Sequence, residues 1–304
     1  MFGMHGNRVR RPSERVRRQG RARTLVQCAC AALANGYAVG FLRGKVFSGP
    51  SKALCVPVLN CSSCPGALGS CPIGALQAVG GSTRHTVSFY VLGTLALFGV
   101  VFGRLICGFA CPFGFVQDLL ARIPLPKVVV PARLDRVLRK VKYLVLGFLV
   151  IGLPAMAVVT GGNVAPLFCK FLCPAGTLEA GLPLVATNPS LQRLVGFLFN
   201  WKVLVLVAVV VLSTIVRRPF CKWLCPLGAF YSLFNKLSLY RMDFHAHACV
   251  GCGKCVRACP MCVDVRKDPN SPECIRCGAC KATCPANAIT TSSKLTQKGP
   301  SPTD

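Results

Sequence analysis

The sequence predicts an all-α transmembrane domain of about four helices, followed by a small α+β module rich in cysteine. The chain is 53% hydrophobic over 304 residues, yet it carries 36 Lys and Arg against 9 Asp and Glu. A net charge of +27 first suggests nucleic-acid binding. However, the basic residues stand mainly beside long apolar runs, which is the charge pattern of an inner-membrane protein. From about His245 the apolar runs give way to dense Cys, Gly and Pro.

Four apolar segments have close to the ~20 residues that a membrane-spanning helix needs. They are residues 24–42, 87–106, 143–161 (which contains Pro154) and 195–216, within a membrane domain of residues 24–235. The first follows a basic tail, residues 1–23, and we interpret it as a span because no clear signal-peptide cleavage site follows it. Lys202 lies inside the fourth segment and is expected to extend to the interface, since a charge at mid-bilayer is costly.

The distribution of Lys and Arg predicts the orientation of these spans. Residues 1–23 contain eight, residues 107–142 seven, and the stretch after the fourth span five, whereas residues 43–86 contain four and residues 162–194 two. We therefore expect a multi-pass protein of a prokaryotic plasma membrane with both termini in the cytoplasm. Residues 43–86 and 162–194 would face outward.

Two C-terminal runs share the spacing Cys-x2-Cys-x2-Cys-x3-Cys-Pro. In this pattern three cysteines bind one [4Fe–4S] cluster and the fourth crosses to the other cluster. One cluster is thus expected to use Cys249, Cys252, Cys255 and Cys284, and the other Cys274, Cys277, Cys280 and Cys259. Zinc also binds Cys-x2-Cys pairs, but the complete eight-cysteine pattern is much more specific for clusters.

These runs predict a bacterial-ferredoxin-like domain with two clusters over residues 245–289. Gly251, Gly253 and Gly278 would let the backbone turn tightly around the clusters. Cys262 lies outside the pattern and is expected to be a small buried residue. The polar residues 290–304 are predicted to be a disordered tail.

The membrane domain contains a second, repeated cysteine motif. It occurs as Cys107-Gly-Phe-Ala-Cys111-Pro, Cys169-Lys-Phe-Leu-Cys173-Pro and Cys221-Lys-Trp-Leu-Cys225-Pro. A fourth copy, Cys64-x6-Cys71-Pro, has the same ending with a wider spacing. Each copy lies near the end of a predicted span.

The predicted orientation groups these motifs by membrane face, and four thiolates suffice for a [4Fe–4S] cluster. An inner cluster would use Cys107, Cys111, Cys221 and Cys225. An outer cluster would use Cys169 and Cys173 with two of Cys55, Cys61, Cys64 and Cys71. Alternatively, those last four hold a cluster by themselves, which leaves Cys169 and Cys173 free or bound elsewhere. A further alternative is that the pairs are structural, or that the outer ones form disulfides. Cys28 and Cys30 are expected to be helix-packing residues.

Several basic residues adjoin the motifs. They either offset the cluster charge or serve as interface charges that set the orientation: Arg104, Lys170, Arg217, Arg218 and Lys222.

The combination of four spans, Cys-x3-Cys-Pro motifs and a two-cluster tail resembles the NapH/CcoG/NosR group of membrane polyferredoxins. The resemblance covers roughly residues 24–289 and rests on Cys107/Cys111, Cys221/Cys225 and the eight tail cysteines. It implies electron transfer between the membrane, often the quinone pool, and a partner redox enzyme. The chain departs from the group in its third motif at Cys169/Cys173 and its cysteines at 55–71. It also shows no CcoG-type extra C-terminal domain or NosR-type flavin-bearing domain.

We therefore expect a membrane-bound iron–sulfur protein that relays electrons between a cytoplasmic donor or acceptor and the quinone pool or an outer-face partner. Its partners would be membrane lipid, redox proteins and quinone, and no nucleic acid. The alternatives are a redox-sensing or assembly factor and a quinone or metal-ion reductase. No acid–base or nucleophile constellation stands out, which favours an electron-transfer subunit over a stand-alone enzyme. No histidine lies inside a predicted span, so a bis-histidine haem is not supported.

Overall fold

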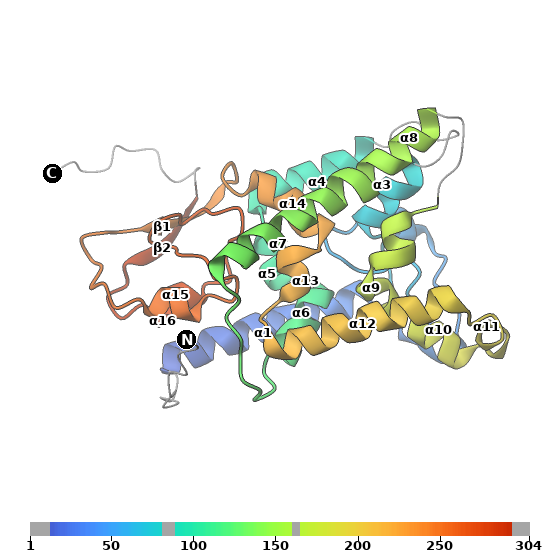
Figure 1. Cartoon of the computed structure of the whole chain (residues 1–304), viewed down its shortest axis with the longest axis horizontal. Helices are drawn as coiled ribbons and strands as arrows, with labels where there is room; N and C mark the ends of the chain where they lie inside the picture. The colour runs from blue at the N-terminus through green and yellow to red at the C-terminus, as the bar shows by residue number, and fades with distance from the viewer. Residues whose placement is uncertain (1–12, 81–88, 160–164, 294–304) are drawn as a thin grey trace.

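The computed structural model describes residues 13–80, 89–159 and 165–293. Three helices and one composite helical segment run along the long axis of the molecule (Figure 1). The helices are α1 (Glu14–Ala34), α4 (Phe89–Phe102) and α12 (Phe197–Ile215). The composite segment consists of α7 (Ala132–Leu144), the π-helical stretch η2 (Val145–Gly152) and α8 (Leu153–Val159).

The helix boundaries agree with the predicted apolar segments to different degrees. α12 nearly coincides with segment 195–216, and among the described residues it alone is long and apolar enough to cross a membrane. α4 is a shorter apolar helix that ends before Gly103, where φ is +56°. Residues 87–88 and 160–161 of the predicted spans lie outside the described residues. The four-span arrangement therefore stays a prediction.

The first predicted span has the wrong boundaries. α1 begins ten residues before position 24, inside the basic tail, and ends at Ala34. Asn35 caps its C-terminus, and a separate short helix α2 (Ala38–Arg43) follows. Arg and Gln are good helix formers, so the basic stretch continues the helix. The apolar residues located the candidate span, but they did not predict the first and last residues of the helix.

The third predicted span also belongs to a longer helical segment, because α7 begins at Ala132. Pro154 lies at the start of α8, directly after the π-helical stretch. Proline lacks a backbone N–H and crowds the preceding turn, and a π-bulge is one way in which a helix changes its hydrogen-bond register. The helix therefore continues past Pro154.

The C-terminal module contains a two-stranded antiparallel sheet. β1 (Tyr240–Phe244) pairs with β2 (Ile289–Ser293), with Met242 opposite Thr291. The prediction that residues 290–293 are disordered is therefore wrong. The β-branched run Ile-Thr-Thr favours a strand, and β1 provides its hydrogen-bonding partner. The remaining tail residues, 294–304, lie outside the described residues.

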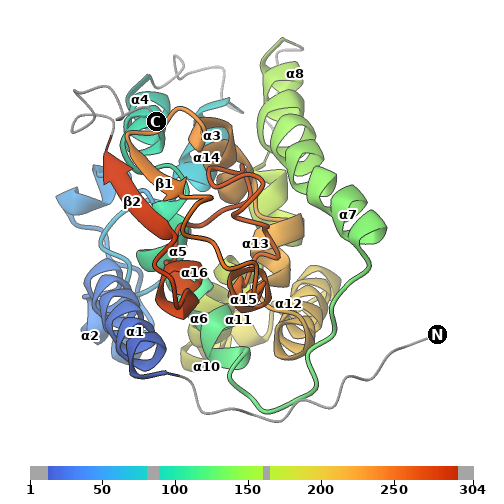
Figure 2. The same cartoon turned by 90° about the vertical axis from the view of Figure 1, so that its left-hand side faces the viewer.

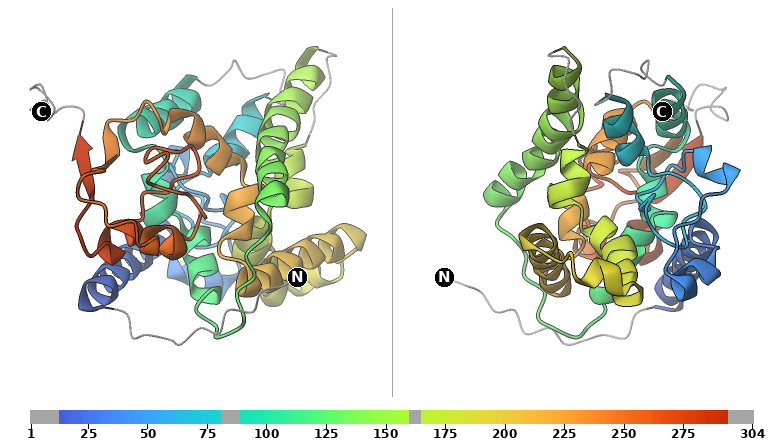
Figure 3. Two further views of the ribbon diagram at one scale, coloured as in Figure 1. Left: turned by 60° about the vertical axis from the view of Figure 1, so that its left-hand side comes forward. Right: turned by 90° about the vertical axis from the view of Figure 1, so that its right-hand side faces the viewer.

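Short helices occupy the centre of the molecule, between the long helical segments (Figure 2). The two helices of the C-terminal module, α15 and α16, lie at one end. The opposite end includes α10 and α11 (Figure 3). The remaining elements are α2, η1 (Pro50–Ala53), α3 (Pro72–Gly80), α5 (Leu105–Phe109), α6 (Pro112–Leu120), η3 (Phe168–Leu172), α9 (Pro174–Gly176), η4 (Thr177–Gly181), α10 (Leu182–Thr187), α11 (Pro189–Gln192), α13 (Pro219–Trp223), α14 (Pro226–Phe234), α15 (Lys254–Ala258) and α16 (Ala279–Thr283).

Candidate iron–sulfur sites

Each Cys-Pro-x-Gly sequence of the membrane domain forms the start of a helix. The proline is the first residue of α3, α6, α9 and α14, and the cysteine directly precedes it. Proline suits this position because a helix leaves its first N–H groups without intrahelical partners. The glycine two residues further on donates its backbone N–H to the cysteine sulfur, at 3.4 Å in Gly176–Cys173 and 3.3 Å in Gly228–Cys225. The motif therefore presents a thiol that is already hydrogen-bonded at a helix N-terminus.

Four cysteines from two motifs meet near the middle of the molecule and form what we call the inner site. They come from α5, α13 and the residues that precede α6 and α14. All four are buried and lie close enough to interact electrostatically. They are Cys107, Cys111, Cys221 and Cys225, the set that spacing and orientation predicted.

Two buried arginines cross-link the motifs of the inner site. Each arginine stands three residues before the first cysteine of its own motif and donates to the backbone carbonyl of the first cysteine in the other. Arg104 Nη2 lies 3.2 Å from the Cys221 oxygen, and Arg218 Nη1 lies 2.7 Å from the Cys107 oxygen. Both side chains are 0% exposed. They therefore place two positive charges beside four thiols, where a thiolate-bound cluster would require compensation.

Asp118 on α6 neutralises part of this charge and ties α1 to the inner site. It accepts two hydrogen bonds from Arg218, at 2.8 and 2.6 Å, and one from Gln27 at 2.9 Å. It also forms an ion pair with Arg23. Although burial opposes ionisation, the Arg218 guanidinium holds the pKa of Asp118 below its usual range. The long N-terminal helix is thereby fixed to the motif helix α6.

The outer site is a cavity of about 410 Å³ whose wall contains four cysteines. Lys202 also lines the cavity and interacts electrostatically with Cys61 and Cys169. The sequence had predicted only that this lysine extends to the membrane interface. Glu179 accepts a 2.7 Å hydrogen bond from the backbone N–H of Cys61, and burial raises the pKa of this carboxyl to about 7. The four cysteines are Cys61, Cys71, Cys169 and Cys173.

Cys55 and Cys64 do not line this cavity. The Cys64 sulfur donates to Asn35 Oδ1 at 3.4 Å, and Cys55 lies near the Tyr231 hydroxyl. This arrangement disfavours the alternative in which residues 55–71 hold a cluster by themselves. It also makes Cys61, rather than Cys64, the counterpart of the first cysteine in the other motifs. The spacing did not reveal this, because the widened motif has no Cys-x3-Cys pair to align.

The structure brings most of the C-terminal cysteines together in the two groups of the crossing pattern. Cys259 from the first run lies with Cys274, Cys277 and Cys280 from the second, and we call this group the second tail site. In the first tail site, Cys249 and Cys255 both lie near Arg266, and Cys284 packs against the hydrophobic cluster that contains Cys255. Cys252, the fourth member, is exposed.

Glycine is required at three places in this module. Gly251, Gly253 and Gly278 have φ values of 67°, 64° and 73°, a conformation that side-chain-bearing residues rarely adopt.

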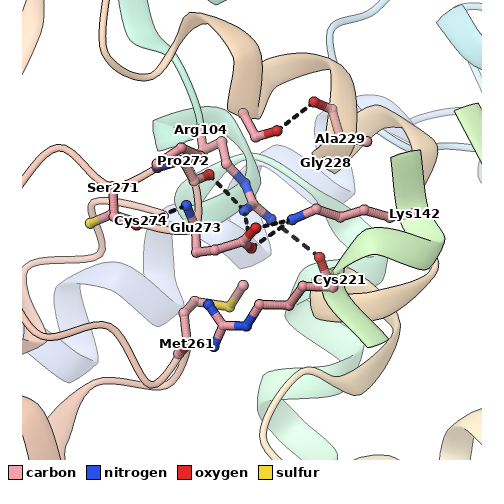
Figure 4. Close-up of polar contacts among 12 residues, drawn as sticks. Arg104, Lys142, Cys221, Gly228, Ala229, Met261, Ser271, Pro272, Glu273 and Cys274 are labelled. Carbon is pink, nitrogen blue, oxygen red and sulfur yellow. Dashed lines mark hydrogen bonds and ion pairs between the residues drawn. The ribbon is translucent and has the colours of Figure 1, made fainter. Parts of the chain in front are cut away.

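The segment that carries Cys274 of the second tail site contacts the motifs of the inner site through Glu273 and Arg104 (Figure 4). Glu273 precedes Cys274 and accepts from Arg104 Nη1 at 2.9 Å and from Lys142 Nζ at 2.5 and 2.6 Å. Although burial opposes ionisation, Arg104 and Lys142 hold the pKa of Glu273 below its usual range. A Cβ on Gly108 would lie only 2.4 Å from the backbone oxygen of Ile275. The loop that carries Cys274 and Cys277 is therefore in backbone contact with α5, which carries Cys107.

Two predictions about isolated cysteines are wrong. Cys262 is exposed, not buried, at a turn with φ of 53°, and it accepts a 3.3 Å hydrogen bond from Lys222 Nζ. Cys28 is exposed and Cys30 half-buried, so Cys28 does not have the packing role we expected.

The basic residues near the motifs divide by burial. Arg104, Arg218 and Lys222 are buried, whereas Lys170 and Arg217 are exposed. Arg104 and Arg218 lie where they would offset cluster charge, because both interact with inner-site cysteines, whereas Lys222 contacts Cys262.

The donor sets fit [4Fe–4S] clusters. Among the described residues no three His, Cys, Asp or Glu side chains converge closely enough to hold a single metal ion. A [4Fe–4S] cluster has four cysteine ligands, one for each iron, so its thiolates need not converge on one point. Four neighbouring thiols with backbone N–H donors meet the requirement at the inner and outer sites.

Comparison with protein-family models also indicates that the chain binds [4Fe–4S] clusters. A family model described as a 4Fe-4S binding domain matches residues 83–131, 143–182 and 197–244, and each match contains one Cys-x3-Cys-Pro motif. A model described as a 4Fe-4S dicluster domain matches residues 241–285.

Several known proteins are similar in sequence to part of this chain. The chain is 25% identical over 190 residues to the electron transport protein YccM of Escherichia coli, covering 60% of this chain and 48% of YccM. It is 31% identical over 166 residues to the methylamine utilization ferredoxin-type protein MauN of Paracoccus denitrificans, covering 53% and 50%. It is 27% identical over 166 residues to the regulatory protein NosR of Pseudomonas aeruginosa, covering 53% and 21%.

These matches are consistent with the NapH/NosR-like ferredoxin family. The matched part of the chain spans about half the length of YccM, and no solved structure matches the chain. The family and domain matches support iron–sulfur electron transfer with [4Fe–4S] clusters as cofactors. The apolar helix α12 supports membrane association of the chain.

Proposed function

We propose that the chain is a plasma-membrane electron relay with four [4Fe–4S] clusters. They lie in the order first tail site, second tail site, inner site and outer site. The observation that carries the proposal is the direct contact of the second tail site with the inner site, through Glu273 and through the Gly108–Ile275 backbone approach. Short protein paths favour electron transfer, and this contact brings the segments that carry the two cysteine groups together.

A second contact supports a path from the inner to the outer site. The backbone N–H of Leu59 lies close to the Cys111 thiol of the inner site, and Cys61 of the outer site follows two residues later. Two residues reach at most ~7 Å in an extended chain. Tyr231 is 0% exposed, and its hydroxyl lies near Cys107 and Cys111 of the inner site and near Cys71 of the outer site. This tyrosine and residues 59–61 would form the bridge between the clusters.

The two ends of the relay differ in access. At the first tail site, Cys252 is exposed and Val250 is 67% exposed, so a soluble redox protein would exchange electrons there. At the other end, the cavity of the outer site would serve the quinone pool or an outer-face partner. With α1, α4, α7–α8 and α12 as the spans, the tail module would lie in the cytoplasm.

Transfer across a bilayer tests the proposal. The full-length protein is reconstituted into vesicles that contain trapped ferricyanide, and dithionite is added outside. We expect the wild type to reduce ferricyanide. Cys111→Ser, which lacks an inner ligand, should not. Cys28→Ser, which alters a cysteine outside every site, is the matched control and should behave as wild type.

Equal transfer by Cys111→Ser and the wild type would remove the inner site from the path. No transfer by a wild-type protein with all four clusters loaded would contradict the relay and favour a redox sensor.

A further inference from the structure

The membrane motifs share one more position, six residues after the second cysteine. At that position, residues from four different helical segments approach cysteine-bearing segments, and three of the four hydrogen-bond the partner motif of their own site. They are Gln77, Gln117, Glu179 and Tyr231. The repeat thus extends beyond the cysteines, and this position decides which hydrogen bond each motif offers its partner.

Two of these residues donate to a cysteine sulfur across the site. Gln117 Nε2 lies 3.1 Å from the sulfur of Cys221 in the inner site. Gln77 Nε2 lies 3.4 Å from the sulfur of Cys169 in the outer site. In both sites the acceptor is the first cysteine of the opposite motif, and both glutamines are nearly fully buried, at 1% and 0% exposed. The two contacts are therefore equivalent.

The surroundings fix which end of each amide faces the sulfur, an assignment that must come from the hydrogen-bond network. Gln77 Oε1 accepts a 2.9 Å bond from the Phe168 backbone N–H, which leaves its NH2 group for Cys169 and for the Ile73 carbonyl. Gln117 Nε2 also faces the Phe113 carbonyl at 3.5 Å, whereas its Oε1 is buried without a hydrogen-bond partner among the described residues. A flipped amide would set its oxygen against that carbonyl and the Cys221 sulfur. Both amides are thus donors to sulfur.

The other two residues form different contacts. Glu179 accepts from the Cys61 backbone N–H, and the Tyr231 hydroxyl donates to the Pro57 carbonyl at 3.0 Å. Neither donates to a cysteine sulfur. Each site therefore has one amide donor from this position, on one side of the site only.

We propose that Gln117 and Gln77 are tuning residues that raise the reduction potentials of the inner and outer clusters, respectively. This inference rests on the proposed function, because it requires clusters at both sites. Hydrogen bonds to the sulfurs are among the determinants of cluster potential. Reduction adds negative charge to the cluster and its thiolates, and an N–H donor to sulfur stabilises the more negative state. Removing the donor should make the cluster harder to reduce.

The test is a redox titration of the full-length protein followed by EPR. Gln117→Leu removes the donor with little change in volume, and Gln117→Met is a second donor-free variant. We expect both to lower the potential of the inner cluster alone, with a threefold to tenfold change in its reduction equilibrium, where tenfold is about 59 mV for one electron. Gln77→Leu should act in the same way on the outer cluster alone. Each glutamine variant is thus the control for the other site.

The outcomes separate this inference from the relay. Unchanged potentials with full iron content would overturn the tuning role and leave the relay standing. Loss of the inner cluster in both Gln117→Leu and Gln117→Met would also overturn it, because the amide would then hold the cluster in place. If Cys111→Ser contains as much iron as the wild type, no inner cluster exists, and both proposals fail.

Discussion

Arg104 and Glu273 form a buried ion pair, 2.9 Å long, between the first inner motif and the residue before Cys274. The same arginine donates to the Cys221 carbonyl, so one side chain contacts both inner motifs and the tail module. Lys142 from α7 completes the group, and both cations are 0% exposed. One carboxylate therefore links both inner motifs and α7 to the tail module.

Glu273→Gln should destabilise this junction strongly. The neutral side chain leaves two buried cations without a counter-charge, and breaking a buried pair in this way costs about 3–5 kcal/mol. We expect a lower thermal transition and faster hydrogen exchange in α5. Asp264→Asn is the matched control, because the Asp264–Arg266 pair is partly exposed and lies within the tail module. Similar small effects of both variants would show that the junction does not depend on the ion group.

Gly108→Ala tests the backbone contact without changing any charge. Its Cβ would lie 2.4 Å from the Ile275 oxygen, so the tail loop must move away from α5. Overpacking of this kind costs about 1–3 kcal/mol, and electron transfer from the tail to the inner cluster should slow. Gly93→Ala is the control, since nothing lies within 4 Å of its Cβ. Stopped-flow reduction that is equally fast in both variants would argue against this contact as the path.

Asp118→Asn should loosen α1 from the inner site. The substitution leaves Arg218 buried without its carboxylate and removes the ion pair with Arg23, at a cost on the order of 3 kcal/mol. We expect faster proteolysis of α1 and faster loss of iron from the inner site. Glu14→Gln, in the exposed first turn of the same helix, should change neither. An α1 that stays protected in Asp118→Asn would mean that apolar packing alone holds it.

Cys61→Ser and Cys64→Ser distinguish the two ligand sets of the outer site. Cys61 lines the cavity with Cys71, Cys169 and Cys173, whereas Cys64 faces Asn35. Cys61→Ser should therefore lower the iron content by about four per chain, and Cys64→Ser should retain it. The reverse result would support the set in which residues 55–71 form the site.

The cysteine spacing predicted most of the candidate sites. The eight tail cysteines follow a local pattern, and the inner set followed from combining two local motifs with the charge-based orientation. The choice of Cys61 over Cys64 depends on how residues 55–71 fold against η3 and α9, which no short-range pattern encodes. The buried contact between Arg104 and Glu273 joins residues that are 169 positions apart, so no short-range pattern could predict it either.

The fold was less predictable than the sites. Hydropathy located α12 closely but misplaced the start of α1 and of α7, because basic residues with high helix propensity extend both helices beyond their apolar parts. β2 was missed because its partner strand lies more than 40 residues earlier in the chain.

The most direct test of the four-cluster account is the content of iron and acid-labile sulfide in anaerobically purified protein, with EPR of the reduced sample. The account predicts about sixteen iron and sixteen sulfide per chain, four of each per cluster. About eight of each would mean that only the tail sites bind clusters. The membrane cysteines would then be structural, and the relay through the inner and outer sites would be contradicted.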